Sequence, residues 1–569
     1  MRFWLASLMF VAGLVTGSIG LVNQYENVPI TEIVADKTLN QPTTYLFVPN
    51  SLVSSYDAPA AMEIRGRNVF VGEARESDIL AWLGESPYVE LKLRLDVASE
   101  TVDLAEIARP GSGSLADPFG GDIWRAETKQ SGLITLPVVQ DGETGYLIAT
   151  DGLEQAPREI RIAWDLPDEP APVAPITYVG LALISMGGLM GAWAAFSSIR
   201  RNRAMRSRNG PRPPRRRTPR RASSQAGKNP RSGRRALRPS AMVAAISGIS
   251  LLTGCVAEYE NPILTPTSVA APQVITPAIT RDQVEEILAD IELVVANADE
   301  NLDRESLEVR VTGPALDMRR FAYNLARRIE DEDRRPEPIE AGPIQLFLPP
   351  ATDTWPRNVM VVTGEENLQM LVLRQEDPRD SYKLFEYMSL LPGVDFPEVA
   401  SEQTGASALK VDNKFLMVSP LSLGEAVGDL LNSGGDSSWI GIVERNNDYF
   451  LDISAVQIGL AQRLANANLN FQHAQSEYPI PLLSTIDGGA LAAIYMIDTY
   501  TIIPKEPGDA VAISGDEAIL LGTQGSATGL ETRYGAMLLF HIPASGSEAR
   551  VRLLGATQQL LTAVALGAQ

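Results

Sequence analysis

Apolar stretches long enough to cross a bilayer constrain the fold of this 569-residue chain more than any other feature. One covers residues 3–22 and another covers 176–199, and each could cross a hydrocarbon core of roughly 30 Å as a helix. A third stretch, 240–257, is shorter. The first could be a cleaved signal peptide, but no good A-x-A site precedes Asn23, which favours an uncleaved anchor. The sequence therefore predicts a membrane protein with two or three spans.

An arginine-rich segment sets the predicted topology. Residues 200–238 contain fifteen Arg, one Lys and no acid, so the rest of the chain carries about −37 (−21 − 16). Positive charge beside a membrane segment stays in the cytoplasm. This places 200–239 inside as a basic disordered loop, with 23–174 and 256–569 outside, in a multi-pass plasma-membrane protein. Such a run could bind nucleic acid, but it lacks interleaved aromatic residues; we expect contact with lipid headgroups and no nucleic-acid partner.

The only cysteine, Cys255, ends what has the form of a lipoprotein signal in the middle of the chain. Residues 234–255 contain a basic region, an apolar core and the lipobox-like "LTGC", in that order. The Pro- and Thr-rich stretch 258–279 suits a tether. We interpret the chain as a two-helix membrane protein joined in frame to a lipoprotein, with Cys255 as the lipidation site. If the signal is not cut, 240–257 is instead a third transmembrane helix, and the sequence leaves both outcomes open.

Glycine spacing in the first two apolar stretches suggests a helix pair. Gly13 with Gly17, and Gly187 with Gly191, have the small-xxx-small spacing that lets helix backbones approach closely. The alternative is that glycine is simply common in membrane helices.

Residues 23–174 contain short runs of alternating polarity separated by turn signals such as "RPGSGS", which predicts an antiparallel β-sandwich. One short helix, "SDILAWLG", is expected, with Ser77 as its cap. Trp124 and Tyr146 are interpreted as core aromatics on strands.

Residues 280–569 predict an α+β domain. Thr280 and Gln283 form a capping-box pair before an amphipathic helix, and strand-like runs follow. The runs beginning at Met370 ("MLVL") and Met537 ("MLLF") are 167 positions apart, and the same offset aligns Lys383 with Arg550. This suggests an internal duplication of a helix-plus-curved-sheet unit of the cystatin-like or NTF2-like kind.

Known catalytic motifs are missing from the sequence. There is no G-x-S-x-G, Walker or H-E-x-x-H motif, and we predict no catalytic, cofactor-binding or metal-binding residues. Asp331 and Asp333 in "EDED" have D-x-D spacing but are interpreted as a solvated charged loop. His473 and His541 are interpreted as ordinary sheet residues. Whether the chain is an enzyme is uncertain, and a non-enzymatic role is favoured.

Two regions resemble uncharacterised actinobacterial proteins. "NVFVGEARESDILAWLG" and "DIWRAETKQSGLITLPVVQDGETGYLIATDG" are similar to ectodomains of membrane proteins from that group. "LFLPPATDTWPRNVMVVT" and "YGAMLLFHIPASGSEARVRLLG" resemble a domain of unknown function found in its lipoproteins and membrane proteins. The excess of Arg over Lys, 41 to 8, fits the GC-rich genomes of that group. The resemblance implies a location and a fold but carries no activity.

The sequence therefore favours a non-enzymatic cell-envelope protein whose two extracytoplasmic domains bind a cell-wall component or a secreted protein. The alternative is a cell-wall or glycan-modifying enzyme, glycosidase-like or glycosyltransferase-like, with an unrecognised site. Convergent carboxylates with raised pKa values in a pocket would favour the enzyme, and an open apolar concavity would favour binding. Residues 270–569 expressed alone are expected to fold as a soluble acidic unit with a cooperative melt.

Overall fold

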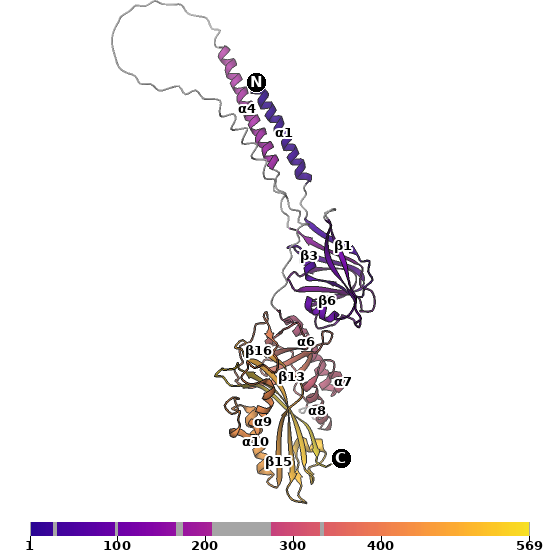
Figure 1. Cartoon of the computed structure of the whole chain (residues 1–569), viewed down its shortest axis with the longest axis vertical. Coiled ribbons are helices and arrows are strands. Elements are labelled where there is room, and N and C mark those ends of the chain that lie inside the picture. Colours follow the sequence, from indigo (N-terminus) through magenta and orange to yellow (C-terminus); the bar gives the residue numbers. More distant parts are fainter. Residues whose placement is uncertain are drawn as a thin grey trace, which may run out of the picture.

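The computed structural model describes residues 2–26, 31–96, 101–166, 175–206, 275–329 and 335–567. Figure 1 shows a pair of long helices, a β-rich domain and an α+β domain that follow one another along the longest axis of the molecule. Several predictions lie outside the described residues: most of the basic loop, the apolar segment with Cys255, most of the tether, and Asp331 and Asp333.

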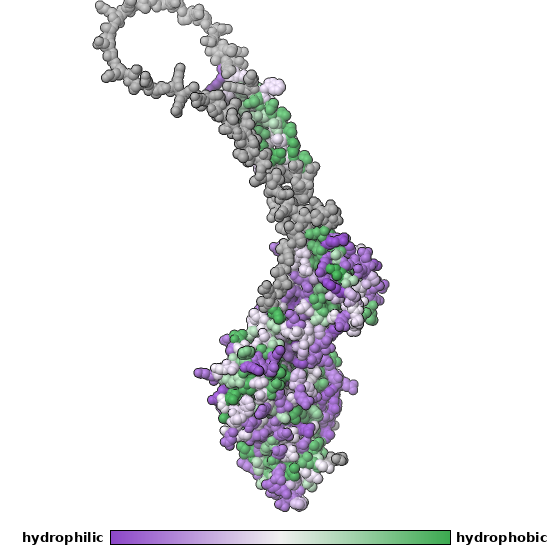
Figure 2. Space-filling view, in the orientation of Figure 1, coloured by the Kyte–Doolittle hydropathy of each residue, from purple (hydrophilic) through white to green (hydrophobic). Residues whose placement is uncertain are grey.

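Two helices are long and apolar enough to cross a membrane. They are α1 (Arg2–Glu26) and α4 (Pro175–Arg206), with candidate spans at Phe3–Val22 and Ile176–Arg200. Their large apolar side chains are exposed, as in Trp4 at 79% and Leu189 at 73%. In Figure 2 the visible parts of these helices are mostly green, whereas purple and white dominate the surface of the two domains. Exposed apolar surface on helices of this length fits a lipid environment.

The two helices pack antiparallel through glycine, as expected for close helix contacts in membranes (Figure 1). A Cβ added to Gly13 would lie 2.7 Å from the carbonyl oxygen of Gly180, and one added to Gly187 would lie 3.0 Å from the carbonyl oxygen of Ala6. Nothing lies within 4 Å of a Cβ added to Gly191. The predicted contact at Gly191 is therefore wrong, although this glycine lies on nearly the same face of α4 as Gly187. Gly180 is the contact residue that the spacing argument missed.

Gly13→Val is expected to separate α1 from α4, because the new Cβ would also lie 2.7 Å from the backbone nitrogen of Ile184. Overpacking of this kind costs roughly 1–3 kcal/mol. Spin labels at Phe3 and Trp193, in a Cys255→Ser background, would report a longer and broader distance distribution by double electron–electron resonance. Gly191→Val is the matched control and should leave the distribution unchanged; equal broadening in both variants would contradict the packing.

The β-rich domain is one nearly closed sheet of eight strands, where the sequence had predicted a two-sheet sandwich. The sheet order is β1-β8-β3-β7-β2-β4-β5, and β6 pairs with β3. The strands are β1 (Glu32–Thr38), β2 (Leu46–Val48), β3 (Ala60–Arg75), β4 (Tyr88–Asp96), β5 (Thr101–Arg109), β6 (Ala126–Val138), β7 (Thr144–Ala149) and β8 (Glu159–Asp165). A single sheet forms because β3 is long. Its first half pairs with β8 and its second half pairs with β7, so β3 joins the strands on both sides into one sheet.

Side chains connect the two edges of this sheet. Lys37 on β1 lies 3.2 Å from Asp103 on β5, and the backbone nitrogen of Asn40 donates to Glu106 at 3.0 Å. Trp124 and Tyr146 are buried, which confirms that they are core aromatics, although Trp124 precedes β6 and is not on a strand. These contacts explain how a sheet with two edges remains compact.

The predicted helix is present as α3 (Glu76–Leu83), but Ser77 does not cap it. Arg75 occupies the cap position without a side-chain cap bond, because it is the last residue of β3 and leads directly into the helix. The hydroxyl of Ser77 instead donates to Asp353 of the other domain at 3.1 Å. A second short helix, α2 (Asn50–Val53), follows β2.

The α+β domain begins with the predicted capping box. The Thr280 side chain accepts from the backbone of Gln283, and the Gln283 side chain accepts from the backbone of Thr280, at the start of α6 (Arg281–Asn301). Then come α7 (Arg304–Leu307) and α8 (Gly313–Ile329), followed by β9 (Ile344–Leu348), β10 (Pro350–Ala351), β11 (Arg357–Thr363), β12 (Gln369–Gln375), β13 (Lys383–Leu390) and β14 (Ala406–Ser407).

The second half of this domain has the same order of helices before strands. Its helices are α9 (Leu423–Ser433) and α10 (Asp448–Arg463), with α11 (Gly515–Leu521) inserted later. Its strands are β15 (Ala467–Gln475), β16 (Leu482–Ser484), β17 (Ala490–Pro504), β18 (Val511–Ala512), β19 (Gly525–Ser526), β20 (Leu530–Ile542) and β21 (Arg552–Ala565). The main sheet has nine described strands, in the order β15-β17-β20-β21-β13-β12-β11-β9, with β16 paired to β17. Each half therefore contributes four consecutive antiparallel strands, and the halves join where β21 meets β13.

Both faces of this sheet are buried. Along β17, Leu491, Ala493 and Tyr495 belong to a core shared with α6, α8 and β11–β13, whereas the alternate residues Ala492 and Ile494 belong to a core shared with α9 and α10. Alternation along a strand sends neighbouring side chains to opposite faces. A strand buried on both faces has a continuous apolar sequence, which explains the run "ALAAIYMI".

A buried ion cluster joins the two domains. We call Arg75, Asp78 and Arg357 the interdomain ion cluster; their exposed fractions are 3%, 2% and 1%. Asp78 Oδ1 lies 2.8 Å from Arg75 Nη2 and 2.6 Å from Arg357 Nη2. Arg357 also lies over the ring of Trp355, 3.5 Å from its centroid. One carboxylate from the β-rich domain thus binds a guanidinium from each domain.

Further polar contacts surround this cluster. Arg310 donates to Asp122 at 2.6 Å, and Arg379 donates to the carbonyl oxygen of Trp82 at 2.8 Å. Thr276, in the part of the predicted tether that the structure describes, donates to Glu143. The last residues of the tether are therefore held against the β-rich domain, and the two domains form a common interface.

Candidate functional site

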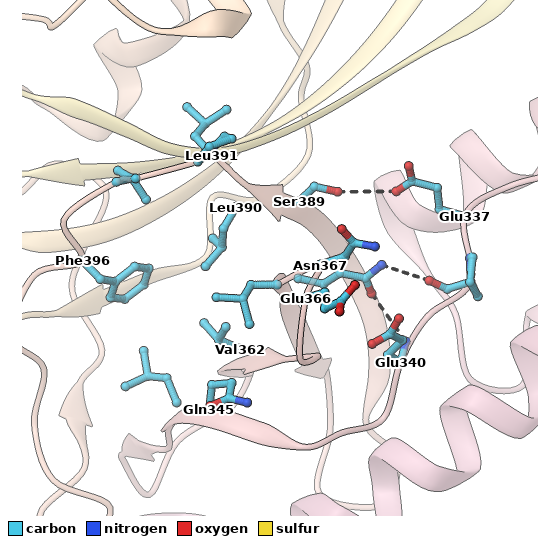
Figure 3. Close-up of a pocket in the computed structure, with 17 residues that line it drawn as sticks. Glu337, Glu340, Gln345, Val362, Glu366, Asn367, Ser389, Leu390, Leu391 and Phe396 are labelled. Atoms are coloured by element: carbon cyan, nitrogen blue, oxygen red, sulfur yellow. Dashed lines mark hydrogen bonds between the residues drawn. The ribbon is translucent and has the colours of Figure 1, made fainter.

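A cavity of about 870 Å³ lies beside β9, the last strand of the main sheet (Figure 3). It is built from the end of the β11–β12 hairpin, the edge strand β9, the end of β13 and the segments before β9 and after β13. Its lining residues are Glu337, Pro338, Glu340, Gln345, Leu346, Val362, Glu366, Asn367, Leu368, Gln369, Ser389, Leu390, Leu391, Pro392, Gly393, Val394 and Phe396. We call this cavity the β9 pocket.

Hydrogen bonds hold the walls of the β9 pocket in place. Gln369 is 6% exposed, and its side-chain nitrogen donates to the carbonyl oxygen of Pro338 at 3.0 Å. The side-chain nitrogen of Gln345 donates to the carbonyl oxygen of Gly364 at 3.0 Å. Gly364 has φ +100°, and a Cβ there would lie 2.5 Å from the carbonyl oxygen of Asn367, so the tight β11–β12 turn requires glycine.

The pocket has an acidic side and an apolar side. In Figure 3, Glu337, Glu340 and Glu366 lie on one side and Val362, Leu390 and Phe396 on the other. The described lining residues include no Lys, Arg or His. Ser389 donates to Glu337 at 3.4 Å, and no described Lys or Arg forms an ion pair with any of the three glutamates. This arrangement suits a ligand that carries positive charge beside an apolar group.

The family of the chain follows from its C-terminal half. A family model described as "Domain of unknown function (DUF8094)" matches residues 275–565, which is 291 of 569 residues. The chain belongs to this family. No curated protein and no solved structure matches it. The β9 pocket lies wholly within the DUF8094 domain, so it is part of the region that defines the family.

Glutamates with a raised pKa lie outside the β9 pocket. Burial raises the pKa of Glu73 and Glu127 in the β-rich domain, and it raises that of Glu386 well above its usual range. Glu386 is on β13, and neither of its carboxylate oxygens has a hydrogen-bond partner among the described residues. The pocket glutamates and the buried glutamates are thus separate sets.

His473 takes part in a buried polar network of the DUF8094 domain. Its Nδ1 lies 2.7 Å from Asp498, and its Nε2 lies 2.9 Å from the side-chain nitrogen of Gln457. Gln558 donates to the other oxygen of Asp498 at 2.9 Å. Both ring nitrogens are occupied, so the pair resembles a catalytic dyad in composition but has no free nitrogen to act as a base.

His541 also lies beside an aspartate. Its Nε2 is 3.2 Å from Asp487, and burial lowers its pKa even though Asp487 opposes this effect. Among the described residues no group of three or more His, Cys, Asp or Glu side chains is arranged to hold a metal ion. Both histidines are on strands, as predicted, but their pairing with aspartate could not be read from the sequence.

The β9 pocket was missed by sequence reasoning. Cys255, the one predicted modification site, lies outside the described residues, as do Asp331 and Asp333. The acidic run that contains those two aspartates continues to Glu337 and Glu340 in "EDEDRRPEPIE", so its charge was a usable signal. Glu366 and Phe396 had no such signal, because they reach the pocket only through strand pairing.

Proposed function

We propose that this is a non-enzymatic protein of the cell envelope, anchored in the plasma membrane, whose DUF8094 domain binds a cell-wall component or a secreted protein in the β9 pocket. The observation that carries the proposal is the pocket itself: a large cavity with an acidic side and an apolar side. Cavities of this kind with a few well-placed polar groups are the usual form of ligand sites.

The proposed membrane placement is supported by the two apolar helices and their charges. The C-terminal end of α1 and the N-terminal end of α4 both lead into the β-rich domain, and Arg200 to Arg206 are at the opposite end of α4 (Figure 1). Under the positive-inside rule this arrangement supports a location of the β-rich domain, and of the DUF8094 domain that it contacts, outside the cell. Lipidation of Cys255 would add a further anchor next to the DUF8094 domain, since two acyl chains hold a protein stably where one is marginal.

The proposed internal duplication of the DUF8094 domain is supported by its topology. Both halves have helices before four consecutive antiparallel strands. Met370 and Met537 are on the equivalent strands β12 and β20, and Lys383 and Arg550 are at or just before β13 and β21. Curved sheets of the cystatin-like or NTF2-like kind provide concave surfaces that suit binding.

The enzymatic alternative has less support. A glycan-modifying enzyme needs an acid–base pair at its substrate, and the glutamates with raised pKa values lie away from the β9 pocket. The His473–Asp498 pair has both ring nitrogens engaged.

A photo-crosslinking amino acid at Asn367 tests the proposal. Asn367 is an exposed residue at the mouth of the β9 pocket, so in intact cells this variant is expected to capture one discrete partner that mass spectrometry can identify. The matched control has the same group at Phe415, which is 81% exposed and is not among the described lining residues, and it should not capture that partner. Equal capture at both positions, or capture at neither, would contradict a binding role for the pocket.

A further inference from the structure

The strand beside the β9 pocket has a free edge. β9 is the last strand of the nine-stranded sheet, and among the described strands it pairs only with β11. Among the described residues no backbone hydrogen bond other than those to β11 involves residues 344–348. An edge strand of this kind presents unpaired N–H and C=O groups that can pair with another extended chain.

The free edge and the pocket are continuous. Gln345 and Leu346 belong to β9 and also line the cavity. A strand added beside β9 would place alternate side chains on the face that contains Leu346 and Val362, because side chains alternate between the two faces. Main-chain bonds to an edge provide affinity, and pockets for alternate side chains provide specificity.

The charge of the pocket selects the side chains that could enter it. Glu337, Glu340 and Glu366 are in the lining, whose described residues include no cation, and Leu390 and Phe396 provide apolar surface opposite them (Figure 3). An acidic glycan or a phosphate would be repelled by these carboxylates. A metal ion is not favoured, because no described cluster has the required ligands.

We infer that the β9 pocket binds an extended cationic peptide segment, which adds as a strand to the edge of β9 and places Lys or Arg side chains against Glu337, Glu340 and Glu366. This deepens the proposed function, on which it rests, by naming the chemistry of the partner: a basic, extended segment of a secreted or envelope protein.

The test uses the full-length protein in detergent micelles and a fluorescent peptide of sequence Lys-Val-Lys-Val-Lys-Val-Lys. We expect saturable binding that weakens as salt is raised, and no binding of the matched Glu-Val peptide. The triple variant Glu337→Gln, Glu340→Gln, Glu366→Gln should bind the Lys-Val peptide at least tenfold more weakly. The control triple Glu477→Gln, Glu506→Gln, Glu548→Gln removes the same charge from exposed positions elsewhere and should bind like the wild type.

Strand addition has a separate readout. Replacing alternate amides of the peptide by esters removes N–H donors from one edge only, so one of the two ester sets should lose at least tenfold in affinity and the other should not. Equal binding of both sets would overturn strand addition, and equal loss in both protein triples would overturn the acidic site. If the Asn367 photo-crosslinker captures a partner but the cationic peptide does not bind, the inferred ligand class is wrong and the proposed binding function stands. If the peptide binds but the crosslinker captures nothing in cells, the proposed function is overturned.

Discussion

Asp78→Ala is expected to destabilise the protein by about 3–5 kcal/mol, which is the usual cost of removing one partner from a buried ion pair. The loss is large because Asp78 is the carboxylate that binds both Arg75 and Arg357, and all three side chains are at most 3% exposed. Without it, two guanidinium groups remain buried at the interface between the domains. Urea unfolding of the full-length protein in detergent, followed by tryptophan fluorescence, measures the change.

The matched control is Glu159→Ala in the same domain. Glu159 lies 3.9 Å from Arg65, and both side chains are more than 60% exposed. An exposed pair of this kind contributes about 0–1 kcal/mol, so the control should unfold almost like the wild type. A loss for Asp78→Ala no larger than that for the control would mean that the interdomain ion cluster does not hold the domains together in solution.

Glu386→Gln is expected to make the protein more stable at neutral pH and to leave its stability unchanged near pH 4. Burial raises the folded-state pKa of Glu386 well above 4.5, so the folded chain retains a proton that the unfolded chain releases. The stability of the wild type therefore falls by up to about 1.4 kcal/mol per pH unit as pH rises from about 4.5 towards the folded-state pKa. Gln does not titrate, so the gain of the variant should grow across this window.

Chemical denaturation of both proteins at pH 4, 5, 6 and 7 measures this difference. Glu548→Gln is the control, because Glu548 is exposed and its replacement should leave the stability at each pH close to that of the wild type. A constant difference between Glu386→Gln and the wild type at all four pH values would show that the carboxyl of Glu386 is not protonated in the folded state. Within the described part of the chain neither of its oxygens has a hydrogen-bond partner, so the Gln variant loses no hydrogen bond that the structure shows.

The independent folding of residues 270–569 stays a prediction. The structure shows that the isolated domain would also lose ion-pair partners at the interface with the β-rich domain. The apolar cores of the DUF8094 domain are made entirely of its own residues, which favours folding in isolation. Arg357 and Arg310, however, would lose Asp78 and Asp122 of the β-rich domain. The excised domain would expose these two arginines, and its interface would no longer be complete.

Sequence patterns were informative where the determining interactions are local. The two candidate membrane helices were predicted because apolar length and composition alone decide whether a helix suits a bilayer. The capping box of Thr280 and Gln283 was predicted because its partners are three residues apart. Ser77 shows the limit of such local rules: the residue has the right type for a cap, yet β3 continues to Arg75 and its hydroxyl binds Asp353 instead.

What the sequence by itself determined is therefore the apolar helices, the β-rich and α+β character of the two domains, and the charge of the acidic run before β9. Only the tertiary structure decided which glycines meet, that the first eight strands form one sheet, and that Asp78 meets Arg357 from 279 positions away. The physical reason is the separation along the chain of the residues that interact. Helix caps, strand alternation and membrane helices depend on neighbouring residues, whereas ion clusters, sheet closure and the β9 pocket depend on which distant segments pair, and many pairings are compatible with the same local pattern.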